Sequence, residues 1–235
     1  MSNSVELTPE ELVVVSRVLS ELLDGKVQFA IMGGAACSLL RAVYNIEYRG
    51  TNDVDLIIAP TQSFNAESIS NWLVKTHPGK VRSVQQFGVA TPAIPISRGD
   101  DEYLVEIEIF DVQAWPNRQQ YDLSDAVANP TETLSFESQP SVSGSGSPSG
   151  VVGVPVMHPK WLLREKILSQ HERQGSAKER TDISDIRALL DIYSGEPLIF
   201  SSQEHVDSLQ ALVQKAPDLT SGLKRAVSCP QVFGI

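Results

Sequence analysis

Two aspartates, Asp53 and Asp55, stand two residues apart in a short apolar run that ends before Pro60. On a β-strand this spacing points both carboxylates to one face and the intervening Val54 to the other. Two negative charges held so close repel each other, and a divalent cation bound by hard oxygen ligands offsets that repulsion. The pattern alone is weak evidence for a Mg²⁺ or Mn²⁺ site, because acidic pairs on solvated strand faces have the same spacing.

A glycine pair, Gly33-Gly34, stands where the apolar run 27–32 gives way to a helical pattern over 35–43. Glycine lets the backbone approach a phosphate closely, and the free N–H groups at a helix start attract anions. We therefore expect this turn to contact the phosphates of a nucleotide.

A further acidic pair lies in the segment 103–110, whose second half alternates between apolar and acidic residues. This period predicts a strand with Glu106 and Glu108 on one face and apolar residues on the other. The pair either faces water or supplies a third ligand to the metal.

The elements that must position these residues form a mixed pattern up to about residue 157. Thr8-Pro9-Glu10-Glu11 is typical of a helix start, and Asp24-Gly25 ends that helix. The acidic strands are expected over 53–58 and 103–110. The other elements expected in this half are a helix over 62–76, two short strands within 81–96 with turns at Gly88 and around Pro92, and strands over 131–136 and 151–157.

Residues 139–150 are rich in serine, glycine and proline, and this composition predicts a flexible loop between two strands. From His158 onward the chain reads as helical. The expected fold class is α/β (α+β), a mixed sheet followed by a C-terminal helical region, with domains over 1–157 and 158–235. The expected C-terminal helices cover 160–170, 181–193, 203–215 and 218–227.

The stretches Met32-Gly33-Gly34-Ala35-Ala36 and Arg49-x-Thr51-x-Asp53-x-Asp55 resemble the signature of the nucleotidyltransferase superfamily, which has a polymerase-β-like core. The resemblance is to small stand-alone members, of the kind found among abortive-infection toxins and minimal nucleotidyltransferases. It implies that Asp53 and Asp55 bind catalytic metal and that Gly33 and Gly34 lie beneath a triphosphate. Fold alone does not establish activity.

The resemblance also assigns the remaining site residues. Glu108 matches the place of the third carboxylate, which is usually an aspartate in the family, and Glu106 is its close rival. Arg49 and Thr51 are assigned to nucleotide binding, with the alternatives that Arg49 orders its loop and Thr51 starts the strand. Lys166 resembles a family lysine that reaches the triphosphate, ahead of an Asp-x-x-Asp motif that starts at Asp182; the alternative is a lysine on the surface of its helix.

These residues imply transfer of a nucleoside monophosphate from a triphosphate such as ATP to a hydroxyl acceptor, which is a small molecule, a protein or an RNA. One alternative is a protein that keeps the fold for nucleotide binding or protein interaction without catalysis. Another is a structural partner in a toxin–antitoxin-like pair.

The formal net charge of −10 disfavours nucleic acid as a partner, because nonspecific binders cluster Lys and Arg against phosphates. Arg173, Lys178 and Arg180 leave an RNA acceptor open. No stretch approaches the roughly 18–20 apolar residues of a membrane-spanning helix, and the start of the chain is acidic and polar, unlike a secretory signal. We expect a soluble cytoplasmic protein.

Overall fold

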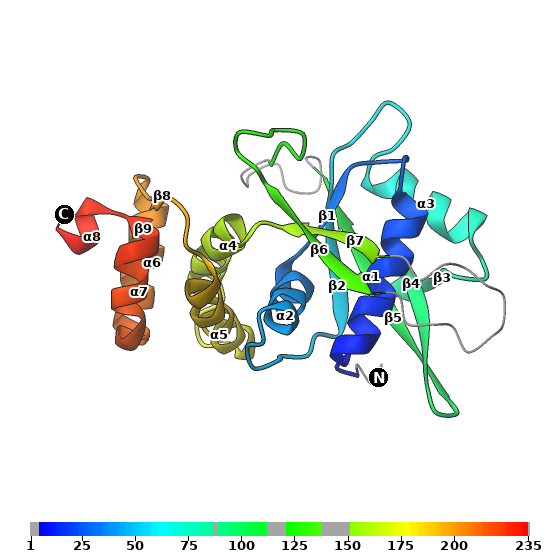
Figure 1. The fold of residues 1–235 in the computed structure, drawn as a ribbon, viewed down its shortest axis with the longest axis horizontal. Helices are drawn as coiled ribbons and strands as arrows, with labels where there is room; N and C mark the ends of the chain where they lie inside the picture. Colours follow the sequence, from blue (N-terminus) through cyan, green and yellow to red (C-terminus); the bar gives the residue numbers. More distant parts are fainter. Residues whose placement is uncertain (1–4, 87–88, 112–120, 138–150, 235) are drawn as a thin grey trace. The chain divides into compact units, whose positions relative to one another are not determined.

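The computed structural model describes residues 5–86, 89–111, 121–137 and 151–234. The chain divides into two compact units, Met1–Met157 and His158–Ile235 (Figure 1). The first unit contains the sheet and the second is mostly helical. Within the described ranges, no helix is long and apolar enough to cross a membrane.

A seven-stranded mixed sheet is the centre of the first unit. Strand β2 pairs in parallel with β5, and β1 pairs in parallel with β7, whereas the other neighbours are antiparallel. In spatial order the strands are β3 (Arg82–Gln86), β4 (Val89–Arg98), β5 (Asp101–Phe110), β2 (Asp53–Ile58), β1 (Phe29–Met32), β7 (Val151–Met157) and β6 (Thr131–Glu137).

Three helices contact this sheet: α1 (Pro9–Leu23), α2 (Gly33–Val43) and α3 (Ala66–Thr76). Helix α1 lies across the sheet and contacts β7 and β4 (Figure 1). It starts with a capping box, in which the Thr8 hydroxyl accepts from the Glu11 N–H and the Glu11 carboxylate accepts from the Thr8 N–H. Its apolar side buries Leu12, Val15, Leu19, Leu22 and Leu23.

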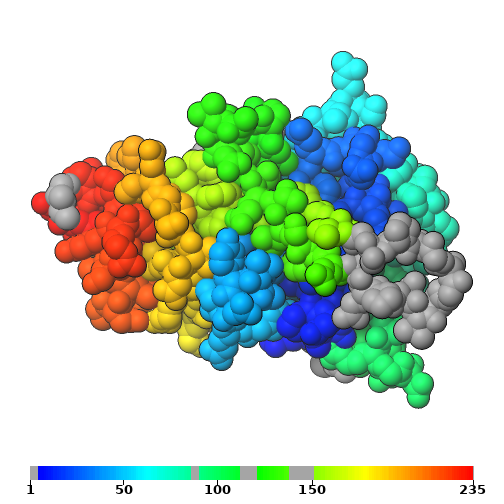
Figure 2. Space-filling model, in the orientation of Figure 1, coloured from blue at the N-terminus to red at the C-terminus, as the bar shows by residue number. Residues whose placement is uncertain are grey.

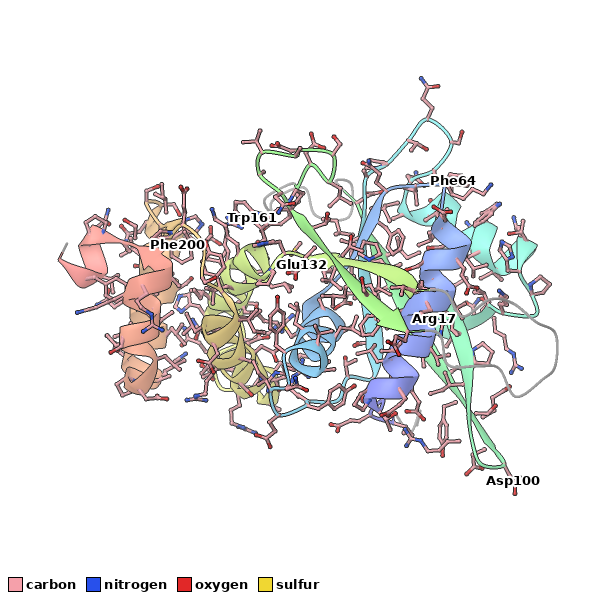
Figure 3. All side chains as sticks on the ribbon, viewed as in Figure 1. Arg17, Phe64, Asp100, Glu132, Trp161 and Phe200 are labelled. Atoms are coloured by element: carbon pink, nitrogen blue, oxygen red, sulfur yellow. The ribbon has the colours of Figure 1, made fainter. Side chains whose placement is uncertain are left out.

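Strand β4 corrects one expectation, because the turn predicted around Pro92 is wrong. The strand continues through Pro92 and Pro95, and each is paired in register with a neighbouring strand. Proline removes a ladder hydrogen bond and is usually confined to sheet edges. Here burial of Ile94 and Ile96 on one face of the strand outweighs that loss. The β4–β5 hairpin extends past the rest of the sheet, with Asp100 at its tip (Figure 3).

The second unit is built on α4 (Pro159–Glu172), α5 (Ala177–Ile192) and α6 (Gln203–Lys215). Helix α4 packs against both α5 and α6. The shorter elements are β8 (Leu198–Ile199), which pairs in parallel with β9 (Val227–Ser228), a 3₁₀ turn (Pro217–Leu219), α7 (Thr220–Ala226) and α8 (Pro230–Phe233).

The predicted fold class, a mixed α/β sheet followed by a helical region, is confirmed. The two-stranded pairing of β8 with β9 was not expected from the sequence. The flexible loop predicted over 139–150 and the turn predicted at Gly88 lie outside the described residues.

Candidate functional site

The two aspartates stand on β2 as the alternation predicts. Val54 and Leu56 are fully buried on one face of the strand, whereas Asp53 and Asp55 are half-buried on the other. The buried face holds the strand in place, because a slip of one residue would turn two carboxylates into the core. The core packing therefore determines where the carboxylates stand.

Strand β5 brings the second acidic pair beside the first. In the parallel register Asp53 is the partner of Glu106 and Asp55 is the partner of Glu108, so the four carboxylates share one face. Ile107 lies between the glutamates in sequence and is buried on the opposite face. The sequence predicted each pair separately, and the crossover between β2 and β5 makes them neighbours.

Gly33 lies directly against Asp55. Its φ is +62°, and a Cβ added there would lie 2.3 Å from Oδ2 of Asp55. Strand β1 explains this closeness, because Met32 is the register partner of Asp55 and Gly33 follows it. Only glycine meets both demands, a left-handed backbone and space for the carboxylate.

Gly34 approaches the loop that precedes β2. A Cβ on Gly34 would lie 3.1 Å from Nη2 of Arg49 and 3.2 Å from Oγ1 of Thr51. The Arg49 guanidinium donates to the carbonyl of Gly50 at 2.9 Å and to that of Gly34 at 3.4 Å. The Thr51 hydroxyl is 3.2 Å from Oδ1 of Asp53, to which it donates. Six of the seven nucleotide and metal residues predicted for the first unit are thus linked through this turn and loop; the seventh, Glu108, lies on β5.

The start of α2 differs from those of its neighbours. The N-caps of α1 and α3, Thr8 and Asn65, each accept a backbone N–H through their side chains. Met32 stands at the N-cap of α2 and makes no side-chain capping bond. The first N–H groups of this helix therefore suit an anion, which the helix dipole also favours.

The donor set fits a hard divalent cation, because the acidic face offers only carboxylate oxygens. The side chains, however, do not converge: among the described residues, no three His, Cys, Asp or Glu side chains lie close enough to hold a metal ion. Ligation by Asp53, Asp55 and a glutamate thus requires rotation about their side-chain torsions, with the strand register unchanged.

Lys166 lies in the second unit, buried between two helices. Its ammonium is 2.7 Å from Oδ1 of Asp182 and 2.8 Å from Oδ2 of Asp185, so α5 holds the lysine of α4 through two carboxylates. Asp182 also accepts from Arg173 at 3.0 Å and from the Ser169 hydroxyl at 3.2 Å. The cluster braces the helix pair, and a contact between Lys166 and a triphosphate remains a prediction.

Residues that the sequence did not single out support the loop before β2. Ser38 of α2 donates to the carbonyl of Arg49, and Tyr48 donates to the carbonyl of Leu7 at 2.9 Å. Burial raises the pKa of Tyr48 to about 12, so its hydroxyl stays protonated and keeps its donor. A serine within an apolar helix and a tyrosine within a loop carry no sequence signal for such contacts.

Comparison with known proteins matches most of the chain to one family. A family profile described as "Nucleotidyl transferase AbiEii toxin, Type IV TA system" matches residues 17–220. The matched segment contains the glycine pair and the four carboxylates. No protein with a curated function matches the sequence significantly.

Several solved structures are similar to this chain. An antigenic nucleotidyltransferase-like protein from Paracoccidioides brasiliensis is 39% identical, with a TM-score of 0.79, over 98% of this chain and 100% of its own. Two structures of the antibiotic-resistance factor ANT(2'')-Ia are 13% identical. Their TM-scores are 0.44 and 0.43, over 93% and 88% of this chain and 97% and 98% of their own.

We predict that Gly33→Ala abolishes nucleotide binding, because its Cβ displaces the Asp55 carboxylate. Gly25→Ala is the matched control, since Gly25 has a φ of +64° and no atom within 4 Å of an added Cβ. Both variants carry the same backbone strain of about 1 kcal/mol. Calorimetric titration with ATP and Mg²⁺ measures the difference, and equal binding by the two variants would contradict the assigned contact.

Lys166→Met should lower the free energy of unfolding by about 3 kcal/mol, because it leaves the buried carboxylates of Asp182 and Asp185 without their shared cation. Lys160→Met, at the start of the same helix, is the control. Its ammonium lies 5.2 Å from the ring centre of Trp161. Urea unfolding followed by circular dichroism gives the free energy of unfolding of both variants. If Lys166→Met lowers it no more than Lys160→Met does, Lys166 does not brace the two helices.

Proposed function

The chain belongs to the AbiEii family of nucleotidyltransferase toxins, and from this premise we propose that it transfers a nucleoside monophosphate from a nucleoside triphosphate to a hydroxyl acceptor, with release of pyrophosphate. The register between β2 and β5 carries the proposal. It sets Asp53 beside Glu106 and Asp55 beside Glu108, with Gly33 against Asp55.

The triphosphate side of the site is the turn from β1 into α2. Gly33 and Gly34 bring backbone N–H groups to the start of a helix without a side-chain cap. Arg49 and Thr51 stand next to Gly34, and their side chains add a guanidinium and a hydroxyl. These groups bind phosphate oxygens through charge-assisted hydrogen bonds. The closeness of Asp55 to Gly33 supports a shared site for phosphate and metal.

The metal side of the site is the acidic face. Asp53, Asp55 and Glu108 would hold Mg²⁺ or Mn²⁺, with Glu106 as the alternative third ligand. The chemistry that such a cation supplies when bound is neutralisation of charge on the triphosphate and a lower pKa for the acceptor hydroxyl. Thr51 orients the Asp53 carboxylate by donating to Oδ1.

Lys166 is assigned to steadying the terminal phosphate by its place in the family motif. Its present partners, Asp182 and Asp185, would then set the position of its ammonium.

The acceptor side is constrained by charge. The first unit has nine Lys and Arg against nineteen Asp and Glu, whereas the second has ten of each. The net charge of −10 therefore belongs to the unit with the carboxylates. Such a field repels polyanions and favours a neutral or cationic acceptor, a small molecule or a protein hydroxyl, over RNA.

A second function, nucleotide binding without transfer, needs the glycine turn alone. An inactive member of the family would bind a triphosphate at this turn and release no pyrophosphate.

We expect Asp53→Asn and Asp55→Asn each to lower pyrophosphate release by about 10²–10³-fold, as when one preorganised charge-stabilising group is lost. Asp101→Asn is the control, because Asp101 is exposed at the start of β5. The assay supplies each of the four triphosphates with Mg²⁺ and a cell extract as the source of acceptor. Wild-type turnover by either aspartate variant would exclude the proposed site.

The third carboxylate is identified by comparing Glu108→Gln with Glu106→Gln in the same assay. Glu108 is the register partner of Asp55, which lies against the glycine turn, so we predict a loss for Glu108→Gln as large as for the aspartates. Glu106→Gln should retain activity within about tenfold of wild type. A larger loss of activity in Glu106→Gln than in Glu108→Gln would assign the third metal ligand to Glu106.

A further inference from the structure

The loop before β2, residues 44–52, has no helix or strand of its own, yet it carries Arg49 and Thr51. Its first half is tied to the end of α2, because the buried Arg41 donates to the carbonyl of Glu47 at 2.9 Å and Ile46 donates to the carbonyl of Arg41 at 2.9 Å. The position of the second half, which approaches the glycine turn, depends on other contacts.

Ser38 makes the inner contact. Its side chain is fully buried in the second turn of α2, with Oγ 2.5 Å from the carbonyl oxygen of Arg49 and 3.0 Å from that of Gly34. The Arg49 guanidinium reaches the same Gly34 carbonyl at 3.4 Å. The hydroxyl, the Arg49 backbone, its guanidinium and the Gly34 carbonyl therefore form a closed ring of contacts.

The N-terminal segment, residues 5–8, makes the outer contact. The Leu7 N–H donates to the carbonyl of Thr51 at 2.8 Å, and a Cβ on Gly50 would lie 2.8 Å from Cβ of Glu6. Arg98 on β4 holds this segment by donating to the carbonyl of Glu6 at 3.1 Å. Figure 2 shows the segment (dark blue) beside the residues near 50 (sky blue) on the surface of the first unit.

We propose that Ser38 is a positioning residue for the triphosphate site, because its hydroxyl holds the Arg49 backbone on α2 and so sets Arg49 and Thr51 beside Gly34 and Asp53. The effect of Ser38 on the triphosphate site rests on the proposed function. Its effect on the position of the loop does not depend on that function. Ser38 contacts the loop backbone and not the substrate, so it acts through Arg49 and Thr51.

The chemistry of the hydroxyl explains why an apolar helix carries a serine there. A buried hydroxyl is costly unless it is hydrogen-bonded, and the carbonyl four residues earlier in the helix already satisfies most buried helical serines. The shorter contact of Ser38 is instead to the loop, and one hydroxyl hydrogen cannot serve both acceptors fully. The loop carbonyl is thus the preferred acceptor, and loss of the Ser38 hydroxyl leaves this half-buried carbonyl without that donor.

Ser16→Ala is the matched control for Ser38→Ala. Ser16 is also fully buried on a helix, and its hydroxyl donates at 2.7 Å to the carbonyl of Leu12, four residues earlier. The two substitutions therefore remove the same atom from the same kind of helical bond. They differ in the contact with the loop, which Ser38 makes from α2 and Ser16 on α1 does not share.

Two measurements test the proposal. Calorimetric titration with ATP and Mg²⁺ should show a dissociation constant raised about tenfold in Ser38→Ala and within twofold of wild type in Ser16→Ala. Hydrogen exchange followed by mass spectrometry should show faster exchange over residues 45–52 in Ser38→Ala alone. Ser38→Thr retains the hydroxyl and should restore both the dissociation constant and the exchange rate of the loop. Circular dichroism checks that all variants keep their helical content.

Three outcomes overturn the proposal: unchanged exchange of the loop in Ser38→Ala, an equal effect of Ser16→Ala, or no recovery in a folded Ser38→Thr. If Ser38→Ala does not fold, Ser38→Cys takes its place, because a thiol fills the site and donates only weakly. If the wild-type protein binds no nucleotide, the proposed function fails, and loop exchange still decides whether Ser38 positions the loop.

Discussion

Repulsion between carboxylates on two adjacent strands is the constraint on which the rest of this structure depends. Neighbouring strands lie about 4.8 Å apart, so the register places four like charges on one face of the sheet, where they repel one another. The first unit accepts this cost along two rows, Asp53 with Glu106 and Asp55 with Glu108. The buried residues Val54 and Ile107 hold the register from the opposite face. We propose that a divalent cation offsets this repulsion when it binds at the acidic face.

The glycine turn and the loop before β2 surround one end of this acidic face. The space that a side chain at Gly33 would need is occupied by Asp55. The space that a side chain at Gly34 would need is occupied by Arg49 and Thr51. Because these two glycines have no side chains, the start of α2 lies close to the carboxylates. The helix start attracts anions and the carboxylates attract cations. A nucleoside triphosphate with its metal carries both charges, and this complementarity links the fold to the chemistry of the family.

Much of this arrangement was predictable from the sequence because it rests on local periodicity. The alternation around Asp53 and around Glu108 predicted two strands with acidic faces, and the glycine pair predicted the turn into α2. The pairing of β2 with β5 was not predictable, since it depends on contacts between distant segments. The contact between Ser38 and Arg49 was not predicted for the same reason. The turn predicted around Pro92 was wrong because burial of the neighbouring residues outweighed the turn preference of proline.

The most direct test of the central claim is calorimetric titration of ATP into the protein with Mg²⁺ and with the metal removed by a chelator. The same titration is repeated on the double variant Asp53→Asn, Asp55→Asn. We predict binding that requires the metal and is lost in the double variant, because the carboxylates and the triphosphate share the cation. Binding that is equally strong without metal, or that survives in the double variant, would contradict the claim that the acidic face is a metal–nucleotide site.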